Sequence, residues 1–135
     1  MQVVLSNEPG QRQALVSALE TFAGQHELPP AVLQAVDLAL EEHLTNIFRY
    51  AYGDSQPHQI IVRFGFDNGS VCVDVEDDGK PFNPLEIPEP DTSLPLESKP
   101  VGGLGIHLIR KFMDSVRYRR EGQKNILHMC KALAG

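Results

Sequence analysis

Apolar side chains recur along the chain with two spacings, one typical of helices and one typical of strands. Three segments are predicted helices: residues 11–22, 31–52 and 102–113. Gly24 is expected to end the first helix, and Pro29 and Pro30 to begin the second, because proline is tolerated in a first helical turn. Five shorter segments are predicted strands: residues 3–5, 59–66, 70–75, 116–120 and 125–131.

Turn residues separate these elements. Asp67-Asn68-Gly69 is a strong hairpin signal, and Glu121-Gly122 is a second turn. Residues 85–100 are proline-rich and acidic without periodicity, and a loop of this length is usually functional or mobile. The order of elements predicts one α+β domain, residues 1–135. We expect a two-layer sandwich, with helices on one face of a mixed, mostly antiparallel sheet.

Composition and charge narrow the class of protein. The chain of 135 residues carries a net charge of −6, which argues against a partner that needs a positive field, such as nucleic acid or a membrane surface. No apolar run approaches the length of a membrane span, and the first residues lack a basic region followed by an apolar stretch. We therefore expect a cytoplasmic protein with no direct nucleic-acid or membrane partner.

The spacing of cysteines and histidines predicts no metal site. Cys72 and Cys130 are far apart and each lies among alternating apolar residues, so we expect two buried free thiols. The five histidines are scattered along the chain. Metal-binding histidines are therefore not expected.

The second predicted helix carries an acid and an amide where a buried face could begin. Ala35, Ala39, Glu42 and Asn46 follow one another at helical spacing, so two small residues precede two polar ones. This stripe is equally compatible with the edge of the solvent face. As a pocket wall, Glu42 would act as a base or position water, and Asn46 would bind a cation through its amide oxygen. An oxygen ligand suits Mg²⁺.

The strand at residues 70–75 ends in three consecutive acids, Glu76, Asp77 and Asp78, followed by a glycine. Their mutual repulsion is costly unless something outside the strand uses at least one carboxylate, although a solvated turn is the simpler alternative. Further along, the glycines of VGGLGIHLIRKF precede a helix and leave backbone N–H groups bare, a natural phosphate site. This cluster lacks the sequence of a P-loop or a Rossmann fingerprint.

Three of these segments, in the same order, resemble the motifs of the GHKL (Bergerat-type) ATP-binding superfamily. Within it, the chain is similar to the anti-sigma factor serine/threonine kinases of bacterial partner-switching systems. The matching phrases are ALEEHLTNIFRYAYGD, VEDDGKPFNP, GGLGIHLIRKFMDSVRY and NILHMCK, and the resemblance covers residues 3–133. No helical hairpin with a phospho-acceptor histidine precedes these motifs, which favours this family over the histidine kinases.

The resemblance implies ATP and Mg²⁺ as cofactors and a role for each motif. Asp77 would accept a hydrogen bond from the adenine amino group, Gly79 would let the backbone approach the base, and Phe82 would anchor the lid. Glu42 would be the catalytic base and Asn46 the magnesium ligand. These roles agree with a reaction that depends mainly on positioning and charge neutralisation.

The remaining implied contacts lie near the lid and in the last strand. Phosphate would be cradled by the glycine segment, which comprises Gly102, Gly103, Leu104 and Gly105. The ATP lid would cover about residues 83–102, with Lys99 as its cation. Asn125 on the last strand would reach the adenine through water, and a surface position on that strand is the alternative. The chain departs from the family at Tyr50, where relatives commonly carry histidine, and at Pro81, which replaces a glycine.

By the same resemblance, the chain would phosphorylate a serine or threonine of a STAS-domain anti-sigma factor antagonist and bind a sigma factor. A homodimer is possible within the family. The alternative is a regulator without kinase activity that sequesters a partner, with or without bound ATP. Positive charges that could meet an acidic partner, or simply form a solvated face, gather in one region: Arg110, Lys111, Arg117, Arg119 and Arg120.

Overall fold

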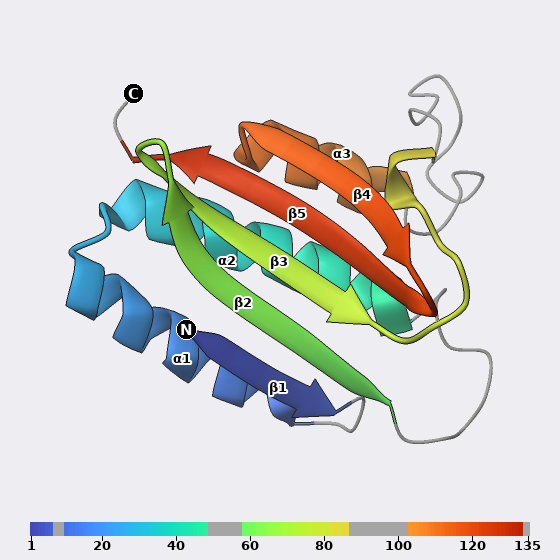
Figure 1. The fold of residues 1–135 in the computed structure, drawn as a ribbon. Helices are drawn as coiled ribbons and strands as arrows, with labels where there is room; N and C mark the ends of the chain where they lie inside the picture. Colours follow the sequence, from blue (N-terminus) through green and yellow to red (C-terminus); the bar gives the residue numbers. More distant parts are fainter. Residues whose placement is uncertain (7–9, 49–57, 87–102, 134–135) are drawn as a thin grey trace.

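The computed structural model describes residues 1–6, 10–48, 58–86 and 103–133, which form a sheet with three helices on one face (Figure 1). The strands are β1 (Gln2–Ser6), β2 (Gln59–Asp67), β3 (Ser70–Asp77), β4 (Ser115–Glu121) and β5 (Lys124–Ala132). The helices are α1 (Gln11–His26), α2 (Pro30–Asn46) and α3 (Gly103–Phe112), with a 3₁₀ turn at Pro84–Glu86. The predicted α+β two-layer sandwich is confirmed.

The strands lie in the order β1-β2-β3-β5-β4, and every pairing in the described sheet is antiparallel. This corrects the expected mixed sheet. Helix α3 connects β3 to β4, but β5 lies between these two strands and pairs with both, so they never become parallel neighbours. The predicted hairpin between β2 and β3 is confirmed, with φ of 49° at Asn68 and 77° at Gly69, the backbone that asparagine and glycine favour.

The core lies between the sheet and the helices. In β3, Val71, Val73 and Val75 are fully buried, because alternate residues of a strand share one face and this face meets the helices. Val36 of α2 and Ile109 of α3 are equally buried on the opposite side of the core. This packing holds α2 and α3 side by side across the middle of the sheet (Figure 1).

The sequence predicts that helix α1 ends at Gly24. In the structure the helix continues to His26. Glu27 closes it with φ of 53° and donates its backbone N–H to a carbonyl of the last turn. Glycine inside a helix costs about 1 kcal/mol relative to alanine. Ring packing offsets this cost, because the His26 ring centroid lies 4.5 Å from that of Phe22 and 4.8 Å from that of Phe66.

Helix α2 begins at Pro30, close to the predicted start, and reaches Asn46. The predicted continuation of this helix through residues 49–52 lies outside the described residues. The same is true of Tyr50, where relatives commonly carry histidine. In the part of the chain that the structure describes, no helix has the length and apolar character required to cross a membrane.

The two cysteines form a disulfide, which corrects the expected free thiols. Cys72 of β3 lies directly opposite Cys130 of β5, with a Cα–Cα distance of 4.2 Å. The two residues are 58 positions apart, and their proximity depends on the pairing of β3 with β5. A local alternation of apolar residues carries no information about that pairing.

Candidate functional site

Three elements that carry the predicted polar residues end or begin at the same end of the sandwich. Figure 1 shows the C-terminal end of α2, the C-terminal end of β3 and the beginning of α3 together on the right of the view. Glu42 and Asn46 lie in the last turns of α2, and Asp77 is the last residue of β3. The fold therefore gathers three separated motifs at one end of the molecule.

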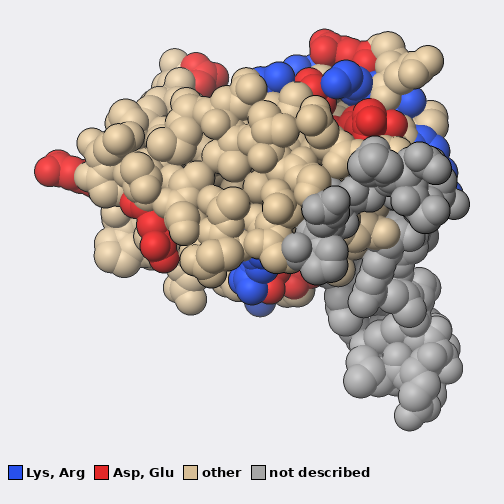
Figure 2. Space-filling view, turned by 90° about the horizontal axis from the view of Figure 1, so that it is seen from below, with Lys and Arg blue, Asp and Glu red and all other residues tan. Residues whose placement is uncertain are grey.

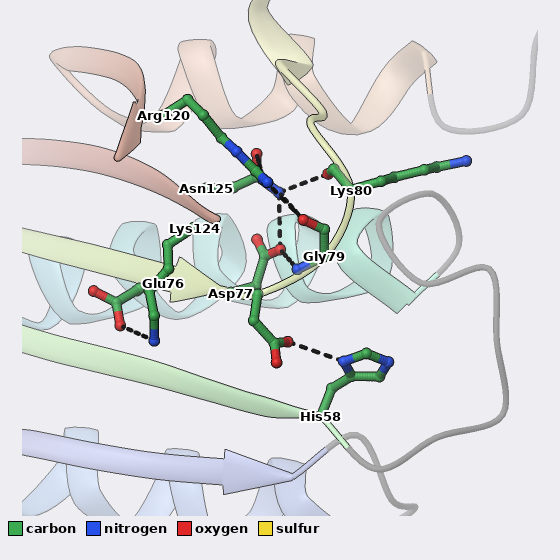
Figure 3. Close-up of polar contacts among 9 residues, drawn as sticks. His58, Glu76, Asp77, Gly79, Lys80, Arg120, Lys124 and Asn125 are labelled. Atoms are coloured by element: carbon green, nitrogen blue, oxygen red, sulfur yellow. Dashed lines mark hydrogen bonds and ion pairs between the residues drawn. The ribbon is translucent and has the colours of Figure 1, made fainter. Parts of the chain in front are cut away.

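Asp77 is a buried carboxylate that shapes the turn after β3. It follows Val71, Val73 and Val75 on the inward face of the strand, so its side chain enters the core and is 3% exposed. Its Oδ1 accepts hydrogen bonds from the Gly79 backbone N–H and from Asn125 Nδ2, both at 2.9 Å (Figure 3). Among the described residues no donor pairs with the second oxygen, Oδ2.

Burial raises the pKa of the Asp77 carboxyl above its ordinary value, and the hydrogen bonds from Asn125 and Gly79 oppose this rise. The negative charge of neighbouring Asp78 adds to the rise. The folded chain thus keeps a partly desolvated acceptor at the end of its central strand, a feature found more often at binding sites than in ordinary cores.

The three consecutive acids are separated by the strand geometry, which resolves their repulsion. Glu76 points to the face opposite Asp77 and its Oε2 lies 3.2 Å from Lys124 Nζ. Asp78 is exposed, and its Oδ1 lies 3.0 Å from His58 Nδ1. Asp77 is the one member of the trio that is buried, so it is the one available to a ligand inside the sandwich.

Asn125, the second residue of β5, holds the segment after β3 in place. Its Nδ2 donates to Asp77 Oδ1 at 2.9 Å and to the Lys80 carbonyl at 2.8 Å. Its Oδ1 accepts from the Phe82 backbone N–H at 3.2 Å and from the Tyr118 hydroxyl at 2.6 Å. Both polar atoms of this buried amide are therefore bonded to protein, and its predicted contact with adenine stays a prediction.

The side chains that hold the segment after β3 form a clamp centred on Asn125. Arg120 completes this clamp and was not predicted as part of the site. Its Nη1 donates to the Gly79 carbonyl at 2.8 Å and to Asn125 Oδ1 at 3.1 Å (Figure 3). A signal was present, because the turn at Gly122 pairs Arg120 directly with Asn125 in the β4–β5 register. Counting back two residues at a time from Arg120 also places Tyr118 on the same face.

We expect Asn125→Ala to lower the free energy of unfolding by about 2–4 kcal/mol, because it leaves several buried donors and acceptors unpaired. Urea unfolding monitored by circular dichroism measures the change. Gln123→Ala, at an exposed position of the same hairpin, is the matched control and should change stability by less than about 0.5 kcal/mol. If the two substitutions lowered the free energy of unfolding equally, Asn125 would not be the residue that holds the clamp together.

On α2, Asn46 is 1% exposed, and its Nδ2 has no hydrogen-bond partner among the described residues. An unpaired buried amide is costly, and its two ends are nearly interchangeable in shape, so it can present its oxygen to a bound group. Glu42, one turn earlier, is half-buried. This donor set fits a magnesium ion bound through one amide oxygen and otherwise through water and phosphate oxygens.

His43 lies between these two residues in sequence and is 3% exposed. Burial lowers its pKa to about 4, so the imidazole is uncharged near neutral pH. Its Nδ1 has no partner among the described residues. A neutral histidine here adds no positive charge that would oppose a cation beside Asn46.

The phosphate segment is described in part. Residues 103–105 form the first turn of α3, whose leading backbone N–H groups have no partner inside the helix. Gly102, Lys99 and the remainder of the predicted lid from residue 87 to 102 lie outside the described residues. Before that point, Pro84–Glu86 forms its short turn, with the Leu85 carbonyl bound by Arg110 Nη2 at 3.0 Å.

The α+β fold of the chain is that of the GHKL class of ATP-binding domains. The chain belongs to the histidine kinase-like ATPase domain family, whose sequence profile matches residues 5–131. The resemblance predicted from the three motifs is thereby confirmed.

Curated relatives with similar sequences carry kinase names. The serine/threonine-protein kinase BtrW of Bordetella bronchiseptica is 28% identical over 90 residues, which cover 67% of this chain and 63% of the relative. The serine-protein kinase RsbW of Oceanobacillus iheyensis is 28% identical over 94 residues, covering 66% of this chain and 59% of the relative. The matched segment thus spans about three-fifths of these relatives.

Solved structures share the fold at low sequence identity. A Mycobacterium tuberculosis structure of RsbU and RsbW domains has a TM-score of 0.63 at 11% identity, over 98% of this chain and 31% of that one. The histidine kinase domain of a blue-light activated kinase from Erythrobacter litoralis EL346 has a TM-score of 0.56 at 18% identity, over 92% of this chain and 60% of that one. At these identities the similarity concerns the fold alone.

Proposed function

We propose that the chain is an ATP- and magnesium-dependent serine/threonine protein kinase of a partner-switching system. The observation that carries the proposal is Asp77, a buried carboxylate with one oxygen bonded to Gly79 and Asn125 and the other without a donor among the described residues. A carboxylate oxygen in this position suits the amino group of adenine. The kinase names of the relatives supply the reaction class.

In this proposal the residues of the chain divide the work of phosphoryl transfer. Asn46 would hold magnesium, which neutralises phosphate charge when bound. The backbone N–H groups of residues 103–105 would bind phosphate oxygens at the beginning of α3. Glu42 would accept the proton of the attacking hydroxyl, and Asp77 would orient the nucleotide through its base.

The acceptor we propose is a serine or threonine of a STAS-domain anti-sigma factor antagonist, with a sigma factor as the second partner and the cytoplasm as the location. The names of the relatives support a serine or threonine as the acceptor. The STAS-domain antagonist, the sigma factor and the location rest on the resemblance to the anti-sigma factor kinases. A homodimer remains compatible with it. Some of the positive side chains expected to face a partner already bind the chain itself, since Arg120 binds the Gly79 carbonyl and Arg110 the Leu85 carbonyl. Figure 2 shows Lys and Arg side chains next to Asp and Glu side chains on the face that it draws.

Calorimetric titration with ATP and with GTP, each with and without Mg²⁺, tests the nucleotide part of the proposal. Magnesium-dependent binding of ATP but not GTP is expected, because guanine offers an acceptor where adenine offers the amino donor. Binding of neither nucleotide would contradict the kinase and leave a regulator that works by sequestering its partner.

We expect Asn46→Ala to remove most of the magnesium-dependent gain in ATP affinity, by about tenfold or more, because the amide oxygen is the proposed protein ligand. Affinity measured without magnesium should change little. Thr45→Ala is the matched control, since the Thr45 side chain is exposed and bonds to the Glu41 carbonyl of its own helix. Unchanged magnesium dependence in Asn46→Ala would exclude the metal role.

A further inference from the structure

The disulfide lies on the face of the sheet opposite the helices, next to an acid–histidine pair. Cys72 and Asp74 alternate in β3 with the buried valines, and Cys130 and His128 lie opposite them in β5. Figure 1 shows this face of the sheet turned toward the viewer, with the helices behind it. Cys130 is partly exposed, whereas Cys72 is 8% exposed. Cys130 is therefore the less buried residue of the pair.

His128 connects the sulfur of Cys130, the less buried cysteine, to a carboxylate. Its Nε2 lies 3.1 Å from Cys130 Sγ, and its Nδ1 pairs with Asp74 Oδ1. When the Nδ1–H group donates a hydrogen bond to the carboxylate, the unprotonated Nε2 faces the sulfur as an acceptor. An orienting acid, a base and a thiol in this sequence of contacts is the arrangement that activates a cysteine nucleophile.

We propose that Cys72 and Cys130 form a redox-active pair that exchanges reversibly with small-molecule disulfides of the glutathione class, with Cys130 as the attacking sulfur. The eight register pairs between β3 and β5 hold the two side chains opposite each other whether or not the sulfurs are bonded. The reduced thiols therefore stay aligned for re-formation. This inference does not depend on the proposed kinase activity, but its reducing environment rests on the cytoplasmic location proposed with that function.

Oxidation of the reduced pair takes two exchange steps. His128 Nε2 accepts the Cys130 proton, and the thiolate attacks one sulfur of the external disulfide, which breaks and releases one external thiol. The Cys72 thiolate then attacks Cys130 Sγ in the mixed disulfide and releases the second external thiol. The protein loses two electrons and two protons, and the external disulfide gains them.

The proposed location of the protein favours reversible exchange over a permanent structural disulfide, and the bond between the two sulfurs favours it over a metal site. Disulfides in reducing compartments are usually transient, and the cytoplasmic location proposed above places this bond among them. The sulfurs of Cys72 and Cys130 and a nitrogen of His128 lie within 4.8 Å of one another, a spacing that also suits a zinc ion in the reduced form. The bond between the two sulfurs in the structure points to redox chemistry.

Single-cysteine variants test the proposal. In native protein treated with oxidised glutathione, Cys130 in Cys72→Ser should form the mixed disulfide about tenfold faster than Cys72 in Cys130→Ser, as followed by mass spectrometry. In urea the two rates should converge, because the histidine contact is lost. Equal rates in the native protein would overturn the proposal.

Histidine variants in the Cys72→Ser background test the base. His128→Gln should slow the reaction of Cys130 by about tenfold, and Asp74→Asn should slow it in the same direction. His58→Gln is the matched control, since it breaks another histidine–aspartate pair, at 3.0 Å from Asp78, and should leave the rate unchanged. If His128→Gln and Asp74→Asn both reacted as fast as the Cys72→Ser parent, the assignment of the base would be overturned.

Wild-type protein, reduced and then given oxidised glutathione, should recover the intramolecular bond with little mixed disulfide. Added Zn²⁺ should not prevent this recovery. Tight uptake of one zinc ion by the reduced protein, with loss of disulfide re-formation, would overturn the redox proposal in favour of a metal site.

Discussion

Glu42→Gln is expected to lower the rate of phosphoryl transfer by about 10²–10⁴-fold while leaving ATP affinity within about twofold of wild type. Glutamine keeps the size of the side chain and its place one helical turn before Asn46, but it cannot accept a proton at neutral pH. The rate is measured as transfer of labelled phosphate from ATP to STAS-domain proteins encoded in the same genome. Phosphate release to water provides an acceptor-independent readout.

The neighbouring acid gives a matched control for this substitution. Glu41→Gln removes the same charge from the same helix, but Glu41 faces solvent and its Oε2 lies 2.8 Å from Arg12 Nη2. It should leave transfer unchanged. If Glu42→Gln and Glu41→Gln transferred phosphate equally well, the catalytic base would have to be sought elsewhere. If neither variant nor wild type transferred phosphate although ATP bound, the sequestering alternative would be favoured.

Asp77→Asn is expected to weaken ATP binding by about 100-fold without unfolding the chain. An asparagine oxygen can replace Oδ1 as acceptor for Gly79 and Asn125, so the turn is retained. The amide nitrogen of the new asparagine then takes the place of Oδ2. This donor would face the amino group of adenine, which is also a donor. An unpaired buried donor and the loss of a charged acceptor together cost about 2–3 kcal/mol. Calorimetric titration with ATP and Mg²⁺ measures the loss.

Stability against pH separates this effect from a loss of fold. Burial raises the pKa of Asp77 in the folded chain above its value in the unfolded chain. As the pH rises past the unfolded value, ionisation of Asp77 therefore lowers the free energy of unfolding. This cost disappears in acid, where the group is protonated. Asp77→Asn should therefore have a melting temperature close to that of wild type at low pH, and its relative stability should increase toward pH 7.

Asp78→Asn is the control for both measurements. It removes an adjacent charge at an exposed side chain bound to His58, so ATP affinity should stay within about twofold of wild type. A loss of affinity in Asp78→Asn as large as that in Asp77→Asn would show that general charge, and not the adenine contact, controls binding. An Asp77→Asn variant that melts well below wild type at neutral pH would contradict the retained turn.

The residues of the candidate site can be placed on their helix or strand from the sequence, because each motif is local in sequence. Glu42 and Asn46 share a helical stripe, and Asp77 follows a run of alternating valines whose face can be counted residue by residue. The support behind these residues was not foreseen. Arg120 was grouped with surface charges, although it bonds to Gly79 and Asn125, since a positive residue on an outer strand has no local signal of an inward bond.

Local sequence patterns are enough to predict the helices and strands, apart from their exact ends, together with the two hairpin turns and the order of the motifs along the chain. These depend on the period of apolar residues and on turn chemistry, which act over a few neighbouring positions. Only the tertiary structure decided that β5 lies between β3 and β4. That one placement joins Cys72 to Cys130, brings Asn125 onto Asp77 and makes the pairings of β5 with β3 and β4 antiparallel. Such contacts connect residues about 50 positions apart, and they follow from packing the whole sheet against its helices.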